Sequence, residues 1–347
     1  MIALRTSERI LYKRCRRRWH LQSQNRGNYV SKSESSIHLW FGSGWHFALE
    51  DFHGYNRFGS PYKAFQGYYD AFKRGGLPLP NEADEYLELA SGMSDHYEIW
   101  LEDRDEFKTL WIDGEPQVEV NALIDLPELG IYYSLTIDRV VVDPYDRVWI
   151  NDYKTVAQFD TGKLETDPQI TSYLLFAPSI YPDIEFEGML YMQFKKSVPK
   201  EPAMLARGGF SLNKNQAVTY GSYLKALKNY YGQRIPKTYV PFLQMLKSKE
   251  DIHGDAFIRR DFVRRGKAYL DAELEKILME GKEMFSPDLP IYPNPTRDCA
   301  WDCPVRPVCL AMDDGSDWEA ILNDNYMQYE ENKEWRDYIQ YPEVNNG

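Results

Sequence analysis

The sequence contains no apolar run that approaches the roughly 18 residues needed to cross a bilayer. Its first 18 residues are rich in arginine and lack the apolar stretch of a secretory signal peptide. We therefore expect a cytoplasmic protein. The 347 residues, 43% of them hydrophobic, are enough for one large domain or for a core with a sizeable insertion.

Cysteine is scarce, and the few cysteines are unevenly placed. One lies near the start and three lie within eleven residues near the end: Cys15, Cys299, Cys303 and Cys309. Without secretion disulfides are disfavoured, so a metal site that ties the two ends together is the natural alternative. The spacing alone leaves an iron–sulfur cluster and a zinc ion open, beside the simpler reading of four unrelated buried cysteines.

Net positive charge is also missing: the formal net charge is −12, which argues against a general nucleic-acid coat protein. The distribution is uneven, however. Residues 1–30 contain eight Lys or Arg against Glu8, whereas residues 310–347 contain ten acids against Lys333 and Arg336. This pattern suits contact with a polyanion at one place, although solvated charged faces would explain it equally well. The candidates for phosphate contacts are Arg14, Arg16, Arg17 and Arg18.

Apolar periodicity and turn residues divide the chain into helices and strands. Stretches rich in valine, isoleucine and tyrosine predict strands at 117–124, 130–142, 147–155 and 184–196. Helical patterns lie before, between and after them, at 5–25, 39–53, 55–110, 167–176, 216–234 and 256–285. This order of elements predicts an α/β or α+β fold.

The best candidate for chemistry lies on one predicted hairpin, which turns at Asp143-Pro144-Tyr145-Asp146. Folding there sets position 138 opposite about 151, so Asp138 and Asp152 approach across strands roughly 4.8 Å apart. Lys154 projects to the same face as Asp152, two residues earlier. Two carboxylates and an ammonium suit phosphodiester hydrolysis with Mg²⁺ or Mn²⁺ on hard oxygen ligands. The alternative is a surface salt bridge.

Two further pairs share a helical face. His46 and Glu50 are four residues apart, as are Gln169 and Tyr173 just after the hairpin. Each pair is weak evidence by itself, because a lone helix histidine is more often a satisfied structural residue.

Together, these residues form four ordered motifs that resemble those of the RecB-like branch of the PD-(D/E)XK nucleases. The motifs are Gly42…His46-x-x-Leu49-Glu50, Ile137-Asp138-Arg139-Val140, Asp152-Tyr153-Lys154-Thr155 and Gln169-x-x-x-Tyr173. Cys15-Arg16-Arg17-Arg18-Trp19 and the three later cysteines resemble the iron–sulfur members of that branch, the AddB nuclease domain and the CRISPR-adaptation exonuclease family. The resemblance is weak across 55–115 and 195–290.

The resemblance implies a restriction-endonuclease-like α/β (α+β) core, with a central mixed sheet flanked by helices and carrying helical insertions. It implies a metal-dependent DNA exonuclease, possibly phage-encoded, that uses two metal ions on a substrate with a free end. The implied metal ligands are His46, Asp138, Asp152 and the Tyr153 backbone carbonyl. Lys154 would assist the attacking water, with Gln169 and Tyr173 as orienting residues, and Cys15, Cys299, Cys303 and Cys309 would hold a 4Fe-4S cluster.

We expect residues 1–347 to form a single nuclease unit. Its parts would be an N-terminal helix at 1–30, a helical insertion at 55–110, a catalytic core at 115–200, a three-cysteine clasp at 290–312 and an acidic tail at 313–347. No Walker A pattern is present, so the chain has no helicase motor of that kind. The alternative function is a DNA-binding or nuclease subunit of a larger helicase or integrase complex.

Overall fold

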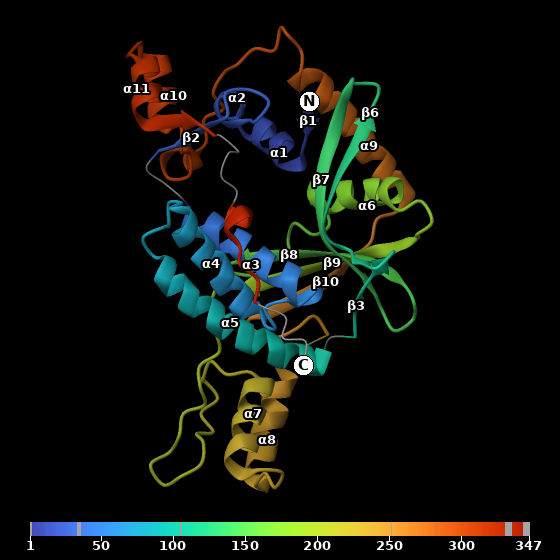
Figure 1. The fold of residues 1–347 in the computed structure, drawn as a ribbon, viewed down its shortest axis with the longest axis vertical. Helices are drawn as coiled ribbons and strands as arrows, with labels where there is room; N and C mark the ends of the chain where they lie inside the picture. The colour runs from blue at the N-terminus through green and yellow to red at the C-terminus, as the bar shows by residue number, and fades with distance from the viewer. Residues whose placement is uncertain (1, 33–35, 105, 251, 330–334, 343–347) are drawn as a thin grey trace.

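A mixed seven-stranded sheet runs through the middle of the computed structural model, which describes residues 2–32, 36–104, 106–250, 252–329 and 335–342 (Figure 1). β7 and β8 are antiparallel, β8 and β9 are parallel, and β9 and β10 are antiparallel. The sheet strands are β1 (Ala3–Leu4), β3 (Lys108–Thr109), β6 (Val118–Leu126), β7 (Ile131–Val142), β8 (Val148–Val156), β9 (Phe186–Lys195) and β10 (Ile258–Val263). Two small two-stranded sheets pair β2 (Tyr29–Ser31) with β11 (Tyr326–Gln328) and β4 (Trp111–Ile112) with β5 (Glu115–Pro116).

Helices cover both faces of this sheet. On one face α3 (Ile37–His53), α4 (Pro61–Gly75) and α5 (Ala83–Arg104) share an aromatic core with Tyr153 of β8 and Phe194 of β9. On the other, α1 (Thr6–Arg14), α6 (Pro168–Ile180) and α9 (Lys267–Met284) share a core with Ile150 of β8. The remaining helices are α2 (Arg16–Gln22), α7 (Tyr220–Tyr231), α8 (Val240–Ser248), α10 (Arg306–Asp314), α11 (Trp318–Asn325) and the short 3₁₀ turns η1 (Lys237–Tyr239), η2 (Arg297–Ala300) and η3 (Trp335–Tyr338).

Strand β7 changes partners along its length. Its last four residues, Arg139 to Val142, pair with Asn151 to Val148 of β8, whereas Tyr132 and Tyr133 pair with β1. Strands β7 and β8 therefore separate next to Asp138 and Asp152, which face each other in this register. There the amide of Tyr153 donates to the Asp138 carboxylate, 2.7 Å away. The separation opens the sheet at the predicted catalytic hairpin.

Most predicted elements are confirmed, with shifted ends. The predicted strands correspond to β6, β7, β8 and β9, and Asp167 caps α6 by accepting from Gln169 N at 2.7 Å. Two predictions are wrong. The helix expected at 5–25 is interrupted at Cys15, whose backbone is extended, and the first part of the helix expected at 256–285 is strand β10. Of the expected acidic tail, residues 330–334 and 343–347, with Lys333, lie outside the described residues.

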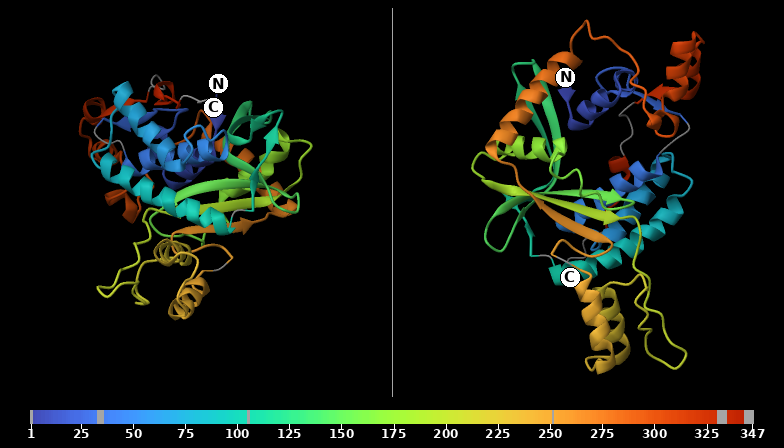
Figure 2. Two further views of the ribbon diagram at one scale, coloured as in Figure 1. Left: turned by 60° about the horizontal axis from the view of Figure 1, so that its bottom comes forward. Right: turned by 180° about the vertical axis from the view of Figure 1, so that it is seen from behind.

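A second, smaller body projects from the far end of β9. Residues 197–250, the α7–α8 module, connect β9 to β10 and extend away from the sheet beyond α5 (Figures 1 and 2). The module has its own hydrophobic core, in which Tyr223 and Leu227 are fully buried and pack with Phe210, Tyr239 and Phe242. It is the main structural elaboration in the region where the sequence resemblance is weak.

Helix α3 packs tightly on α4 at Gly44, and this contact yields a stability prediction. A Cβ at Gly44 would lie 2.7 Å from the rings of Phe65 and Tyr68, whereas a Cβ at Gly42 would meet only Thr155 Oγ1 at 3.7 Å. Both changes to alanine gain about 1 kcal/mol of helix propensity, so their difference isolates the overpacking cost. We expect Gly44→Ala to be less stable than Gly42→Ala by about 1–3 kcal/mol. Urea unfolding of the two variants measures this, and equal midpoints would contradict the packing.

Candidate active site

Three metal-ligand side chains converge where α3 meets β6 and β7. Ligand atoms of His46, Glu119 and Asp138 all lie within 4.8 Å of one another. His46 Nδ1 is 3.4 Å from Asp138 Oδ1 and 3.6 Å from Glu119 Oε1. Asp138 is buried, whereas His46 and Glu119 are half-buried and so remain reachable from solvent. In the part of the chain that the structure describes, this is the one group of three or more His, Cys, Asp or Glu at such separations.

Asp152 and Lys154 lie on β8 beside this group. The ladder pairs Arg139 with Asn151, which sets Asp138 directly opposite Asp152, one residue from the predicted register. Lys154 Nζ lies 2.9 Å from Oδ1 and 2.8 Å from Oδ2 of Asp152. Asp152 is outside the group of three and is held by the lysine. Asp152 is 1% exposed, so this ion pair is shielded from solvent on the carboxylate side.

Burial and the close approach of carboxylates, His46 and Lys154 shift the pKa values of these groups at this site. Burial raises the pKa of Asp152 to about 6, against the opposing effect of Lys154. Burial disfavours the charged form of His46, but the Asp138 carboxylate outweighs it and raises the His46 pKa to about 10. Burial also raises the pKa of Glu119, while Asp152 and Asp138 raise that of Lys154 despite its burial. The cluster thus holds protons that a bound divalent cation would replace.

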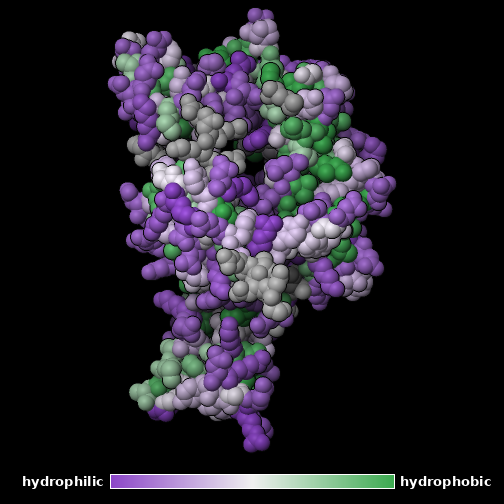
Figure 3. All heavy atoms as spheres, viewed as in Figure 1, coloured by the Kyte–Doolittle hydropathy of each residue, from purple (hydrophilic) through white to green (hydrophobic). Residues whose placement is uncertain are grey.

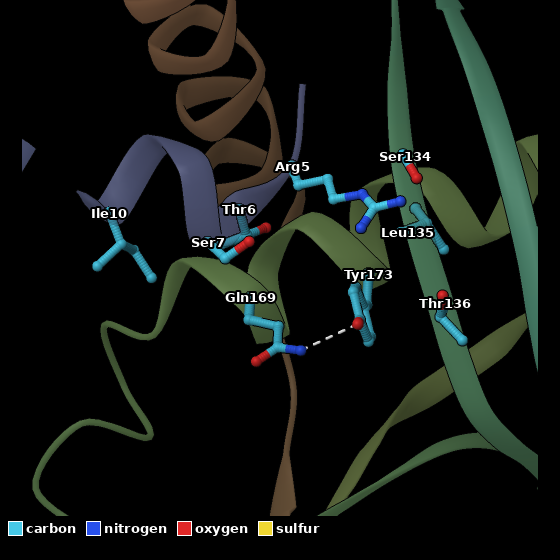
Figure 4. A pocket seen from close by; sticks show the side chains of 9 residues that line it. All are labelled: Arg5, Thr6, Ser7, Ile10, Ser134, Leu135, Thr136, Gln169 and Tyr173. Carbon is cyan, nitrogen blue, oxygen red and sulfur yellow. Dashed lines mark hydrogen bonds between the residues drawn. The ribbon is translucent and has the colours of Figure 1, made fainter. Parts of the chain in front are cut away.

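Gln169 and Tyr173 follow on α6, one helical turn apart. Gln169 Nε2 donates to the Tyr173 hydroxyl at 2.9 Å, and burial raises the pKa of that hydroxyl. Both residues line a cavity of about 200 Å³ together with Arg5 and Thr136 (Figure 4). The negative charges of Asp152 and Asp138 also raise the pKa of the Tyr173 hydroxyl, so this cavity lies near the predicted catalytic hairpin.

A second cavity, of about 580 Å³, is lined by residues of the metal-ligand cluster itself. His46, Glu119 and Lys154 line it, together with Lys196 from the end of β9 and Arg336 from the C-terminal segment. Arg336 is held by Glu50, with its Nη2 2.8 Å from Oε2. Of the predicted residues, His46 and Lys154 therefore line the larger cavity, whereas Gln169 and Tyr173 line the smaller one.

Glu119 is the site residue that the sequence reading missed. It lies on β6 opposite Asp138, between the paired residues Val118 and Val120, and its φ of 46° is in the left-handed region. A non-glycine residue there is uncommon, and such strain concentrates at functional sites. The sequence does contain a signal for it: a turn at Pro127–Gly130 sets Glu119 opposite Asp138, as the turn at Asp143 sets Asp152 opposite Asp138.

Comparison with known families decides the class of this site. The sequence profile of the PD-(D/E)XK nuclease superfamily matches residues 7–310. The chain belongs to the PD-(D/E)XK nuclease superfamily. This confirms the predicted superfamily, and membership implies a phosphodiester hydrolase that acts on nucleic acid. His46, Glu119 and Asp138 are the candidate ligands for a divalent metal. The comparison with curated proteins finds no match. None of the described helices is long and apolar enough to span a membrane.

The four cysteines of this PD-(D/E)XK nuclease lie where the N-terminal helices α1 and α2 contact the segment from Asn294 to Cys309. Cys15 joins α1 to α2, Cys299 lies in η2, and Cys303 and Cys309 lie before and within α10. Asn294 N donates to Cys15 Sγ at 3.4 Å, and Arg17 Nη1 to Cys309 Sγ at 3.5 Å. Within the described residues, no three of these thiols come within 4.8 Å of one another. A closed cysteine clasp is therefore not present in the structure.

The four N-terminal arginines predicted to contact DNA all have acidic partners within the nuclease. Arg14 pairs with Asp302 at 2.6 Å and Arg17 with Asp313 at 2.7 Å. Arg16 pairs with Glu283, and Arg18 Nη1 donates to the carbonyl oxygen of Asp302 at 2.9 Å. These contacts tie α1 and α2 to the C-terminal region and give the basic segment a structural role.

Proposed function

We propose that this nuclease is a RecB-like DNA exonuclease, used in recombination, repair or DNA processing, that cleaves by a two-metal mechanism. The observation that carries the proposal is the convergence of Asp138, Asp152 and Lys154 with His46 and Glu119 at the point where β7 and β8 separate. A hairpin salt bridge would not require a histidine and a strained glutamate from two other elements.

The donor set fits divalent cations. Glu119, Asp138 and Asp152 supply hard carboxylate oxygens, and His46 adds one imidazole nitrogen, a combination that suits Mn²⁺ or Mg²⁺. Such an ion polarises the phosphoryl group and favours ionisation of the attacking water. Tyr153 would add its backbone carbonyl, since its amide already fixes Asp138.

The remaining residues position the reactants. Asp152 holds the Lys154 ammonium at the edge of the larger cavity, where it orients the attacking water and offsets charge that develops on the phosphoryl oxygens. In the smaller cavity, Gln169 donates a hydrogen bond to the Tyr173 hydroxyl and so fixes its position. This pair orients Lys154 or the DNA backbone. Contacts between the N-terminal arginines and DNA phosphates remain a prediction. To make them, DNA would have to displace the acidic partners of Arg14, Arg16 and Arg17.

End-labelled linear DNA, single- and double-stranded, tests the proposal directly when it is compared with closed circular DNA of the same sequence. With Mn²⁺ or Mg²⁺, an exonuclease releases mononucleotides or short products from linear DNA and leaves the circle intact. Cleavage of the circle would make the protein an endonuclease, and no cleavage of any DNA would contradict the function.

We also propose that Cys15, Cys299, Cys303 and Cys309 bind one structural 4Fe-4S cluster. Backbone amides already point at two thiols: Thr296 N is 3.3 Å from Cys299 Sγ, and Asn294 N is 3.4 Å from Cys15 Sγ. Cys15 lies between α1 and α2, and Asn294, whose amide it accepts, precedes Cys299 by five residues, so the N-terminal cysteine contacts the segment that carries the other three. One zinc ion with bonds of roughly 2.3 Å would hold its sulfurs closer together than a cluster with irons between them.

Cys15→Ala is expected to lower the stability and solubility of the protein first, and its activity only as a consequence. Hydrolysis moves no electrons, so the cluster has no part in the chemistry, but it would link residues 284 positions apart. Purified protein should absorb broadly near ~400 nm and contain about four irons per chain. A colourless, folded protein with one zinc would contradict the cluster without touching the nuclease assignment.

A further inference from the structure

Positive charge is concentrated in the α7–α8 module, although the whole chain is acidic. Residues 197–250 contain nine Lys or Arg against Glu201 and Glu250, in a chain of net charge −12. All nine cations are exposed: Lys200, Arg207, Lys214, Lys225, Lys228, Arg234, Lys237, Lys247 and Lys249. Hydrophilic residues accordingly cover much of the projecting part in the space-filling view (Figure 3).

These cations differ from the N-terminal arginines in what they contact. Among the described residues only Lys247 has a carboxylate within salt-bridge distance, Glu250 at 3.6 Å. Lys249 donates to the carbonyl oxygen of Lys214, which leaves both charges uncompensated. Exposed cations without acidic partners retain counterions and can bind phosphate without breaking an ion pair, whereas Arg14 and Arg17 would have to break one.

The module presents its charges from a rigid platform. Lys225 and Lys228 lie three residues apart on α7 and so share a face, while Arg234 and Lys237 follow in the turn toward α8. Beneath them Tyr223 and Leu227 are fully buried in the module's own core. The backbone positions of Lys225 and Lys228 are therefore set by a helix that packs on the module's core.

The module also begins at the active site. Lys196, the residue before it, lines the larger catalytic cavity and lies 3.1 Å from His38 Nδ1, with no carboxylate of the described residues in salt-bridge range. Strand β9, which ends at Lys195, pairs in parallel with β8, the strand that carries Asp152 and Lys154. Lys196 therefore connects this cavity to the module along the chain, and Lys200 follows four residues later.

We propose that the α7–α8 module binds the sugar–phosphate backbone of the nucleic-acid substrate, away from the bond that is cleaved. This rests on the proposed function, since it assigns a substrate-holding surface to the same enzyme. The interaction is electrostatic and does not depend on the base sequence, because the exposed cations bind phosphates and release the counterions of the nucleic acid.

The test compares two triple variants with the wild-type chain. Lys225→Gln/Lys228→Gln/Lys237→Gln removes three module cations. Lys63→Gln/Lys108→Gln/Lys282→Gln removes three exposed lysines of α4, β3 and α9 that form no ion pair with the described residues. Binding of a fluorescent 40-base-pair duplex is measured at several salt concentrations, with Ca²⁺ in place of the catalytic metal. The module variant should reduce the slope of log K against log salt by about two to three, and the control variant should not.

Two further measurements make the outcome decisive. Replacing the same three module lysines by arginine, which keeps the charge, should retain the wild-type slope, and thermal unfolding should be alike in all variants. If the wild-type chain cleaves DNA but the slope of the glutamine variant is unchanged, the inference is overturned. The partner of the module would then be an acidic protein. A wild-type chain that neither binds nor cleaves DNA contradicts the proposed function itself, and the inference with it.

Discussion

Replacing Asp138 by asparagine is expected to reduce DNA hydrolysis about 10³-fold or more while the fold stays intact. Asparagine keeps the shape and can still accept the Tyr153 amide at its carbonyl oxygen, but it removes the charge shared with His46 and Glu119. Loss of metal-based charge stabilisation worth several kcal/mol corresponds to roughly this factor, because each 1.36 kcal/mol changes the rate tenfold. Steady-state cleavage of end-labelled DNA measures the loss, and Asp152→Asn should behave in the same way.

Stability without and with metal is the control for this variant. In the apo protein Asp138 is the charge partner of a protonated His46, so asparagine there should lower the unfolding temperature without metal while the circular dichroism spectrum stays that of the folded chain. Added Mn²⁺ should stabilise the wild-type chain by mass action and Asp138→Asn much less. Full activity in either aspartate variant would contradict the assignment of the site.

Local signals explain why the catalytic hairpin could be predicted from the sequence. The turn is encoded by Asp143, whose carboxylate accepts the amides of Tyr145 and Arg147 at 2.9 and 3.0 Å. That five-residue connection, from 143 to 147, sets the register one residue away from the predicted one. The cap of α6 at Asp167 was predictable for the same reason, because an aspartate before a proline is a local signal of a helix start.

Long-range contacts explain what the sequence could not indicate. Strand β10 was expected to be helical, but its six residues pair with the open edge of β9. Cys15 interrupts a helical pattern because it caps α2 and accepts a hydrogen bond from Asn294, which is 279 residues away. Arg336 reaches the catalytic cavity through its ion pair with Glu50, a contact that no local pattern encodes.

Long-range contacts also explain why residues 1–30 form ion pairs within the protein, whereas most cations of the α7–α8 module form none with the residues that the structure describes. Composition marked residues 1–30 as basic, but the acids that neutralise Arg14, Arg16 and Arg17 come from the chain beyond residue 280. The cations of the α7–α8 module are more dispersed in the sequence, and folding leaves most of them exposed without acidic partners. Charge counts therefore identify a binding surface only after the ion pairs are known.

Glu119→Gln is expected to lower the apparent affinity for the activating metal by roughly 10- to 100-fold, and activity at limiting metal to the same extent. Glu119 is one of three side chains whose ligand atoms lie within 4.8 Å, and glutamine keeps its size while removing its charge. Activity as a function of Mn²⁺ concentration measures the shift. Excess Mn²⁺ should restore much of the lost activity here, because His46 and Asp138 still bind.

Glu115→Gln supplies the matched control, because Glu115 is exposed on the neighbouring β5 and bonds the Tyr55 hydroxyl instead of the cluster. Its metal dependence should equal that of the wild-type chain. If Glu119 only neutralised His46, its replacement would change the unfolding temperature and leave the Mn²⁺ dependence as it was. That result would remove Glu119 from the metal site and leave its left-handed backbone without a catalytic reason.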